Sequence, residues 1–192
     1  MGMIEAGCVL RVPYCVFRIP CCMVRGACEV TMTYEDWMKT VPQEITDDPL
    51  WRMEVYRLSL FAEDLAWPDT SRLIQDKRTV SLADQLFRAA GSVGANIAEG
   101  YSRQSGKDQA RYYEYSLGSA REARNWYWPA RHVLTERVAL HRIRLLTHII
   151  RLLLKIIPSE RGYHLHEDAP EYNMVLDVND LLQNIPMPPD AA

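Results

Sequence analysis

Between residues 50 and 158, apolar residues recur every three or four positions in four successive segments, with short polar stretches between them. This spacing places them on one side of an α-helix and predicts helices at about 50–66, 79–99, 106–134 and 136–157. No segment alternates apolar and polar residues as a strand would. The pattern therefore predicts an all-α fold, an antiparallel up-down four-helix bundle with irregular N-terminal and C-terminal extensions.

Residues that favour helix starts precede three of these segments. Asp47-Asp48-Pro49 offers an Asp cap with proline in the first turn, and Ser105 with Asp108 forms a capping pattern before the third helix. Thr135 is a candidate cap for the fourth helix.

Prolines and a glycine suggest where the helices end. We expect Pro68 to end the first helix and Pro158 the fourth, because proline lacks the N–H that a helix interior needs. Pro129 should kink or split the third helix near Tyr127. Gly100 suits the left-handed position that follows a helix end.

The fourth predicted helix has two neighbouring apolar stripes, more apolar surface than one small bundle core usually requires. The stripes are Ala139, Ile143, Leu146, Ile150, Leu153 and Ile157, and Leu145, Ile149, Leu152 and Ile156. Either both stripes are buried inside one subunit, or one of them packs against other subunits.

Three segments flank or precede this bundle, which we assign to residues 50–158. Residues 1–31 form an irregular segment that holds all five cysteines, and residues 32–49 form a lead-in. Because no cysteine follows Cys28, the bundle needs no disulfide, which fits the cytoplasm. Residues 1–31 lack an apolar period, and we expect Met32 to be the natural start. Residues 159–192 are expected to be a mobile acidic tail, the alternative being a docking peptide for the bundle or a partner.

The formal net charge of −3 conceals an uneven distribution. Residues 50–158 carry a net charge of +6, residues 1–49 carry −3 and residues 159–192 carry −6. The fourth predicted helix has a row of cations at helical spacing, and the third has a second basic set beside Trp128. The two sets are Arg137, His141, Arg144, His148, Arg151 and Lys155, and Arg121, Arg124 and Arg131. Such rows are either ordinary solvated faces or surfaces that bind a nucleic-acid backbone.

Trp128 and its two neighbours, Trp126 and Tyr127, have two interpretations. Arginine and tryptophan together stack on unpaired bases, which favours contact with single strands. Alternatively, the three aromatic residues are buried at a contact between subunits.

A polar set lies along the second and third helices. It consists of Arg88, Ser92, Asn96 and Glu99 on one face of the second, and Gly118, Ser119 and Glu122 on the third. We expect an interhelical hydrogen-bond network that sets the helix register; the alternative is a catalytic carboxylate pair, Glu99 and Glu122. No metal-binding, nucleotide-binding or nucleophile motif occurs, so we expect no enzymatic activity, metal, cofactor or small-molecule substrate. No apolar run is long enough to span a membrane.

Two stretches resemble a known signature. They are LADQLFRAAGSVGANIAEGYSR at 82–103 and YSLGSARE at 115–122. Together they resemble the four-helix-bundle proteins encoded in intervening sequences of bacterial 23S ribosomal RNA genes, a family similar to the accessory variability protein of diversity-generating retroelements. The family's signature residues correspond here to Gln85, Arg88, Ala89, Ser92, Asn96, Glu99, Gly100, Gly118, Ser119 and Glu122.

The resemblance implies an antiparallel bundle that assembles as a ring-like homopentamer, with signature residues in structural rather than catalytic roles. In the retroelement branch it also implies binding to a reverse transcriptase and to nucleic acid through basic surfaces. The present chain differs from that branch in its negative net charge, in Pro129 and in its acidic tail. We therefore expect an oligomeric accessory protein that binds RNA or DNA; the alternative is a protein-interaction scaffold without nucleic-acid binding.

Overall fold

The computed structural model describes residues 33–161 and 177–189. The Cys-rich segment 1–31, the expected start at Met32 and residues 162–176 of the acidic tail lie outside the described residues.

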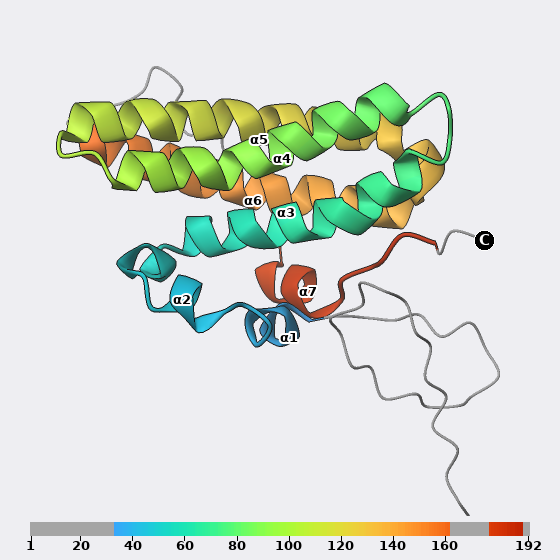
Figure 1. Ribbon diagram of the computed structural model, residues 1–192, viewed down its shortest axis with the longest axis horizontal. Coiled ribbons are helices and arrows are strands. Elements are labelled where there is room, and N and C mark those ends of the chain that lie inside the picture. The colour runs from blue at the N-terminus through green and yellow to red at the C-terminus, as the bar shows by residue number, and fades with distance from the viewer. Residues whose placement is uncertain (1–32, 162–176, 190–192) are drawn as a thin grey trace, which may run out of the picture.

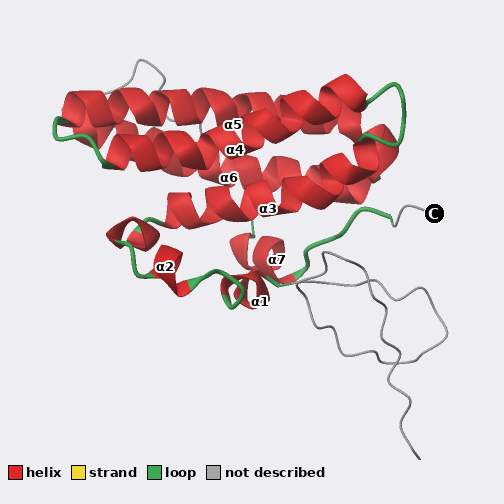
Figure 2. Cartoon of the chain, viewed as in Figure 1, coloured by secondary structure: helices red, strands yellow, loops and turns green. Residues whose placement is uncertain are grey.

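Four long helices make up most of the described chain (Figures 1 and 2). They are α3 (Glu54–Leu73), α4 (Val80–Tyr101), α5 (Gly106–Leu134) and α6 (Glu136–Arg161). Consecutive helices pack against each other and α3 also contacts α6, which closes the bundle. Short connections make consecutive helices antiparallel, and only Thr135 separates α5 from α6. No β-strand occurs in the ranges described, so the predicted all-α four-helix bundle is confirmed.

The apolar stripes predicted from periodicity face the interior of the bundle. Leu86, Val93 and Ile97 of α4 are at most 1% exposed. On α6 most residues of both stripes are buried within this one chain, and the rest, Ile143, Leu152 and Ile156, are half-buried. A single subunit therefore accommodates the apolar excess of α6 without a second copy.

Pro68 and Pro158 do not end the first and fourth predicted helices, contrary to expectation, and Pro129 does not split the third. Helix α3 continues past Pro68 to Leu73, α6 continues past Pro158, and α5 is unbroken across Pro129. After Pro68, the side chains of Asp69 and Leu73 are fully buried. Their tertiary contacts offset the helix hydrogen bond that proline removes.

The predicted helix caps lie where expected. The Ser105 hydroxyl accepts the Asp108 N–H at 3.1 Å, and α5 begins directly after it. The Asp48 carboxylate accepts the Leu50 N–H at 2.8 Å, but it starts the short 3₁₀ helix η1 (Pro49–Arg52) rather than α3. The Thr135 hydroxyl accepts a long hydrogen bond of 3.4 Å from the Val138 N–H.

Close contacts between α4 and α5 depend on small residues. Gly100 lies inside α4 rather than in a left-handed position after it, which corrects the prediction. A Cβ at Gly100 would lie 2.9 Å from Cε1 of Tyr113, so the glycine makes room for that buried ring. One turn of helix further along α5, the buried Ser116 hydroxyl donates to the Val93 carbonyl oxygen at 2.8 Å.

The lead-in belongs to the folded core. It forms α1 (Tyr34–Met38) and α2 (Gln43–Thr46) before η1. Trp37 is 1% exposed, and its ring lies 5.0 Å from Phe61 of α3 and 5.4 Å from Tyr34, measured between centroids. These aromatic contacts hold α1 against the bundle.

The described part of the C-terminal tail also packs on the bundle. Residues 178–183 form α7 (Val178–Gln183), which lies beside α1 and against α6 (Figure 1). Leu181 is 5% exposed and Ile185 is fully buried. The expectation of a mobile tail is therefore wrong for residues 177–189, and the docking alternative describes them.

Candidate nucleic-acid interface

Most of the basic row predicted on α6 lies on its solvent side. Arg137, Arg144 and Lys155 are exposed and Arg151 is half-buried; these four residues are called the basic ridge below. Their side chains project outward because the apolar stripes of α6 occupy the opposite side of the helix.

Helix α5 places further cations next to this ridge. Arg121, Arg124 and Arg131 are half-buried, and Arg124 Nη1 lies 3.5 Å from Thr147 Oγ1 of α6. The Arg131 guanidinium lies 3.8 Å above the centre of the Trp128 ring, which is 53% exposed. The ridge and these α5 residues, with Trp128, are called the basic face.

The neighbouring aromatic residues do not all share this exposure. Tyr127 is 2% exposed and donates its hydroxyl proton to Asp69 Oδ2 at 3.0 Å, inside the same chain. Tyr127 is therefore unavailable for a contact between subunits. Of the three aromatic residues considered for such a contact, only Trp126 and Trp128 remain candidates.

His141 is not part of the exposed row, and the prediction for this residue is wrong. The ring is 6% exposed beneath α7, and its Nε2 lies 2.8 Å from the Leu181 carbonyl oxygen. Its Nδ1 lies 2.9 Å from Arg142 Nη1, which can only donate, so the neutral Nε2–H tautomer fits both contacts. Burial, then the charge of Arg142, lowers the pKa of His141 to about 4. This side chain therefore adds no positive charge near pH 7.

His148 is half-buried at the edge of the row. Its Nε2 lies 3.5 Å from Glu54 Oε1 of α3, in an orientation that forms no hydrogen bond. When protonated, its charge would face this carboxylate rather than add fully to the ridge.

Few acidic residues accompany the basic face along the chain. The basic face spans residues 121–155, which hold eight Lys or Arg residues and two acidic residues, Glu122 and Glu136. One of the eight, Arg142, points into the core and is neutralised by Asp69. This excess of cations along the chain would favour a polyanion at the surface.

A buried charged cluster lies beneath the ridge, and the sequence patterns did not predict it. Arg142 is 1% exposed and Asp69 is fully buried; Arg142 Nε lies 2.8 Å from Asp69 Oδ2. Arg142 also donates through Nη2 to the Pro186 carbonyl oxygen at 2.9 Å. One feature of the sequence could have indicated that Arg142 is buried. It lies off the basic row and three residues before Leu145, so it shares the side of the helix that carries this buried residue.

The polar signature residues make only a limited connection between helices. Ser92 and Asn96 bond to carbonyl oxygens of α4 itself, at 2.8 and 2.7 Å. Glu99 pairs with Arg103, which follows the end of α4, and Arg103 donates to the Tyr112 hydroxyl of α5 at 2.7 Å. On α5, Glu122 accepts a 3.4 Å hydrogen bond from Trp126 of the same helix. Among the described residues, the expected network is therefore reduced to the Glu99–Arg103–Tyr112 contact at one end of α4.

The same residues lie largely on the surface. Arg88 is exposed and lies 3.4 Å from Asp84, Gln85 is half-buried, and Ser119 donates to the Tyr115 carbonyl oxygen at 3.0 Å. Gly118 is exposed, and nothing lies within 4 Å of where its Cβ would be. Gly118 therefore makes no close contact between helices among the described residues.

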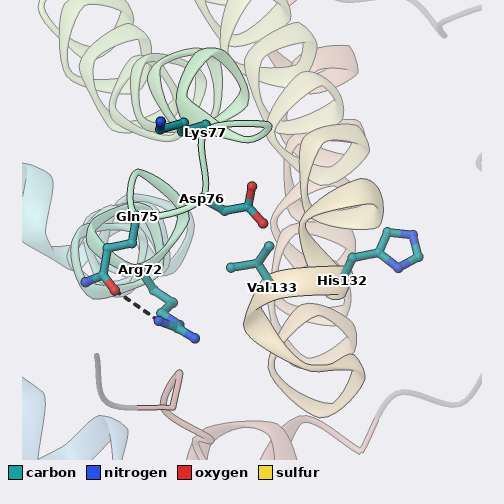
Figure 3. Close-up of a pocket in the computed structure, with 6 residues that line it drawn as sticks. All are labelled: Arg72, Gln75, Asp76, Lys77, His132 and Val133. Atoms are coloured by element: carbon teal, nitrogen blue, oxygen red, sulfur yellow. Dashed lines mark hydrogen bonds between the residues drawn. The ribbon is translucent and has the colours of Figure 1, made fainter. Parts of the chain in front are cut away.

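A shallow, open hollow of about 560 Å³ lies where the α3–α4 connection meets α5. Its lining residues are Arg72, Gln75, Asp76, Lys77, His132 and Val133 (Figure 3). Lys77 and His132 point away from each other, Arg72 bonds to Gln75, and Asp76 is paired with Arg78. A catalytic or ligand site requires side chains that converge on a common point, and these do not.

Metal-binding clusters and membrane-spanning helices are both absent from the described residues. Among them, no group of three or more His, Cys, Asp or Glu residues is placed to hold a metal ion. None of the helices in the described ranges has the length and apolarity to cross a membrane.

The fold and the surface together define a helical-bundle protein with a basic face and no convergent reaction centre among the described residues. Residues 52–155 match the 23S rRNA-intervening sequence protein family, and the chain belongs to that family. A crystal structure of a protein of unknown function from the S23 ribosomal protein family of Bacteroides thetaiotaomicron is similar, with 25% identity and a TM-score of 0.51. The match covers 54% of this chain and 97% of that one. No protein with curated annotation matches the chain.

Proposed function

We propose that this protein is a non-catalytic, oligomeric accessory protein that binds single-stranded RNA through its basic face. The observation that carries the proposal is the exposure of Arg137, Arg144 and Lys155 along one side of α6, next to the cations of α5. Arg131 stacked on exposed Trp128 supplies a planar surface on which an unpaired base can stack. RNA phosphates bound along the ridge would release counterions.

The buried titratable groups beneath α7 do not support a catalytic role, which favours a binding role for the protein. Asp69, Arg142 and His141 are bonded to one another or to main-chain carbonyl oxygens beneath α7. A general acid or base must reach a substrate, and these groups are occupied inside the fold.

The partner class follows from the resemblance to the retroelement proteins. We propose an accessory role in an RNA complex, with a reverse transcriptase as the protein partner. DNA shares the phosphate chemistry, so a single-stranded DNA of the same sequence is the comparison ligand in the following experiment.

Fluorescence anisotropy with a labelled single-stranded RNA tests the proposal across a salt series. The Arg144→Ala/Lys155→Ala double variant should bind more weakly, and its slope of log K against log salt should fall by about 1.4, or about 0.7 for each phosphate that is no longer neutralised. A matched control removes two exposed cations elsewhere, with Lys39→Ala and Arg88→Ala.

The control double variant should keep the wild-type slope. Absence of any salt-dependent binding by the wild-type chain at about 50 mM salt would contradict the proposal. Equally weakened binding by both double variants would show that net charge, rather than the basic face, governs binding.

A second candidate function is a protein-interaction scaffold, and the exposed Gly118 favours it. Glycine inside an exposed helix costs roughly 1 kcal/mol relative to alanine, yet no side chain in the described part of the chain uses the space at Gly118. We propose that this face contacts a second copy and that the protein assembles as the homopentamer implied by the family resemblance. Light scattering at micromolar concentration should give five times the chain mass; a monomer would contradict the assembly.

A further inference from the structure

The contact between the C-terminal segment 177–189 and α6 has the features of peptide recognition. Two adjacent α6 side chains each bind one main-chain carbonyl oxygen of the segment: His141 binds Leu181 at 2.8 Å and Arg142 binds Pro186 at 2.9 Å. Leu181 and Ile185, four residues apart, are both buried on the bundle. A docked helical peptide is usually held by apolar anchors at such helical spacing, and here two side-chain hydrogen bonds to main-chain carbonyl oxygens are added to the two anchors.

The segment cannot hold this shape alone. Helix α7 has six residues, far fewer than the roughly 12–15 that an isolated helix needs in water. Its own side-chain reinforcement is small. The Asp177 carboxylate accepts the Asn179 and Asp180 N–H groups at 3.0 and 3.2 Å, and Asn184 donates to the Asp180 carboxylate at 2.8 Å. Its helical conformation therefore depends on the surface of α1 and α6.

The bundle, by contrast, has a core of its own. Most of the buried apolar residues belong to α3, α4, α5 and α6, and the segment adds Leu181 and Ile185. The family match ends at residue 155. The match to the similar crystal structure covers 54% of this chain but 97% of that one. That protein is therefore too short to contain both the bundle and a counterpart of residues 177–189. The segment is thus an addition to a bundle that exists without it in a relative.

We propose that the α6 surface carrying His141 and Arg142 is a peptide-binding site, with residues 177–189 as a ligand that detaches while the bundle stays folded. The site recognises a peptide with two apolar residues four positions apart, which correspond to Leu181 and Ile185. The main-chain carbonyl oxygens of the first apolar residue and of the residue after the second must be accessible to His141 and Arg142. Detachment uncovers His141 and Arg142 beside the basic ridge. The proposal does not depend on RNA binding.

The test uses the full chain and a labelled peptide of residues 177–189. The Leu181→Asp/Ile185→Asp double variant empties the site by removing both apolar anchors, and the peptide should bind it saturably. Wild-type chain should bind the same peptide at least ten-fold more weakly, because its tethered segment competes at an effective concentration near the millimolar range. A peptide with the same two substitutions is the matched control and should not bind.

Failure of the peptide to bind the folded double variant would overturn the proposal. Loss of the bundle's helical signal in that variant would also overturn it, because the segment would then be essential to the fold. Hydrogen exchange on the wild-type chain gives an independent measure: amides of α7 should exchange at least ten-fold faster than the central amides of α5 and α6. Equal protection would show that the segment opens only when the whole bundle unfolds.

Discussion

Arg142 and Asp69 show how one ion pair connects distant parts of the chain. The two residues are 73 positions apart in sequence, and their pair joins α6 to the end of α3. Tyr127 of α5 and the Pro186 carbonyl oxygen bond to the same two side chains. A buried charge with every partner in place is tolerated, whereas removing one partner leaves the other unpaired in the interior.

Replacing Arg142 with Met should therefore destabilise the fold by about 3–5 kcal/mol. The matched control, Arg88→Met, removes an exposed arginine paired with Asp84 one turn away and should cost at most about 1 kcal/mol. Urea denaturation followed by circular dichroism at pH 7 measures both. Equal effects of the two substitutions would contradict the structural role of the buried pair.

His141 should make stability depend on pH in mildly acidic solution. Its pKa is lowered to about 4, first by burial and then by Arg142, with Arg144 lowering it further and Asp180 of α7 raising it. The unfolded chain binds a proton at this ring near pH 6.5, but the folded chain does so only near pH 4. The contribution is fully present above pH 6.5 and is lost as the pH falls toward 4, by on the order of 3 kcal/mol.

The measurement is urea denaturation of wild type and His141→Gln at several pH values between 7 and 4. Glutamine can donate to the Leu181 carbonyl oxygen but does not titrate in this range. The difference in unfolding free energy between the two proteins should shrink or change sign as the pH falls. A constant difference would contradict the assignment of His141 as buried and neutral.

At the scale of helices, periodicity predicted the four long helices well but not the short α1 and α2, and single residues predicted the ends poorly. The α5 prediction, 106–134, agrees with the observed bounds. The first helix was predicted to end at Pro68, but α3 continues because Asp69 and Leu73 are buried farther along. Such burial depends on contacts with α5 and α6, which local sequence does not show.

Two glycines inside helices, one against a buried ring and one at the surface, give opposite predictions. Gly100→Ala should destabilise the chain, since its Cβ would lie 2.9 Å from the Tyr113 ring. Gly118→Ala should stabilise an isolated chain by about 0.5–1 kcal/mol, since its Cβ meets open space. Thermal unfolding of both variants checks the pair. If Gly118→Ala instead destabilises the protein or lowers its oligomer mass, another copy packs on that face.

At the scale of the molecule, the sequence predicted features that depend on local helical spacing and missed those that depend on contacts with distant segments. Exposure of Arg144 and Lys155 followed from helical spacing, because their position opposite the apolar stripes is a local property of α6. The burial of His141 did not follow, because the segment that covers it lies 40 residues further along the chain. The same holds for the signature polar residues. Their bonds lie mostly within one helix, and spacing alone could not distinguish these from bonds between helices.

The most direct test of the central claim locates bound RNA on the surface. A single-stranded RNA with photoreactive 4-thiouridine is crosslinked to the full chain at low salt, and the crosslinked peptides are identified by mass spectrometry. The account predicts crosslinks concentrated in α5 and α6, around Trp128 and along Arg144 to Lys155. Crosslinks confined to α3 and α4, or none at all, would contradict it.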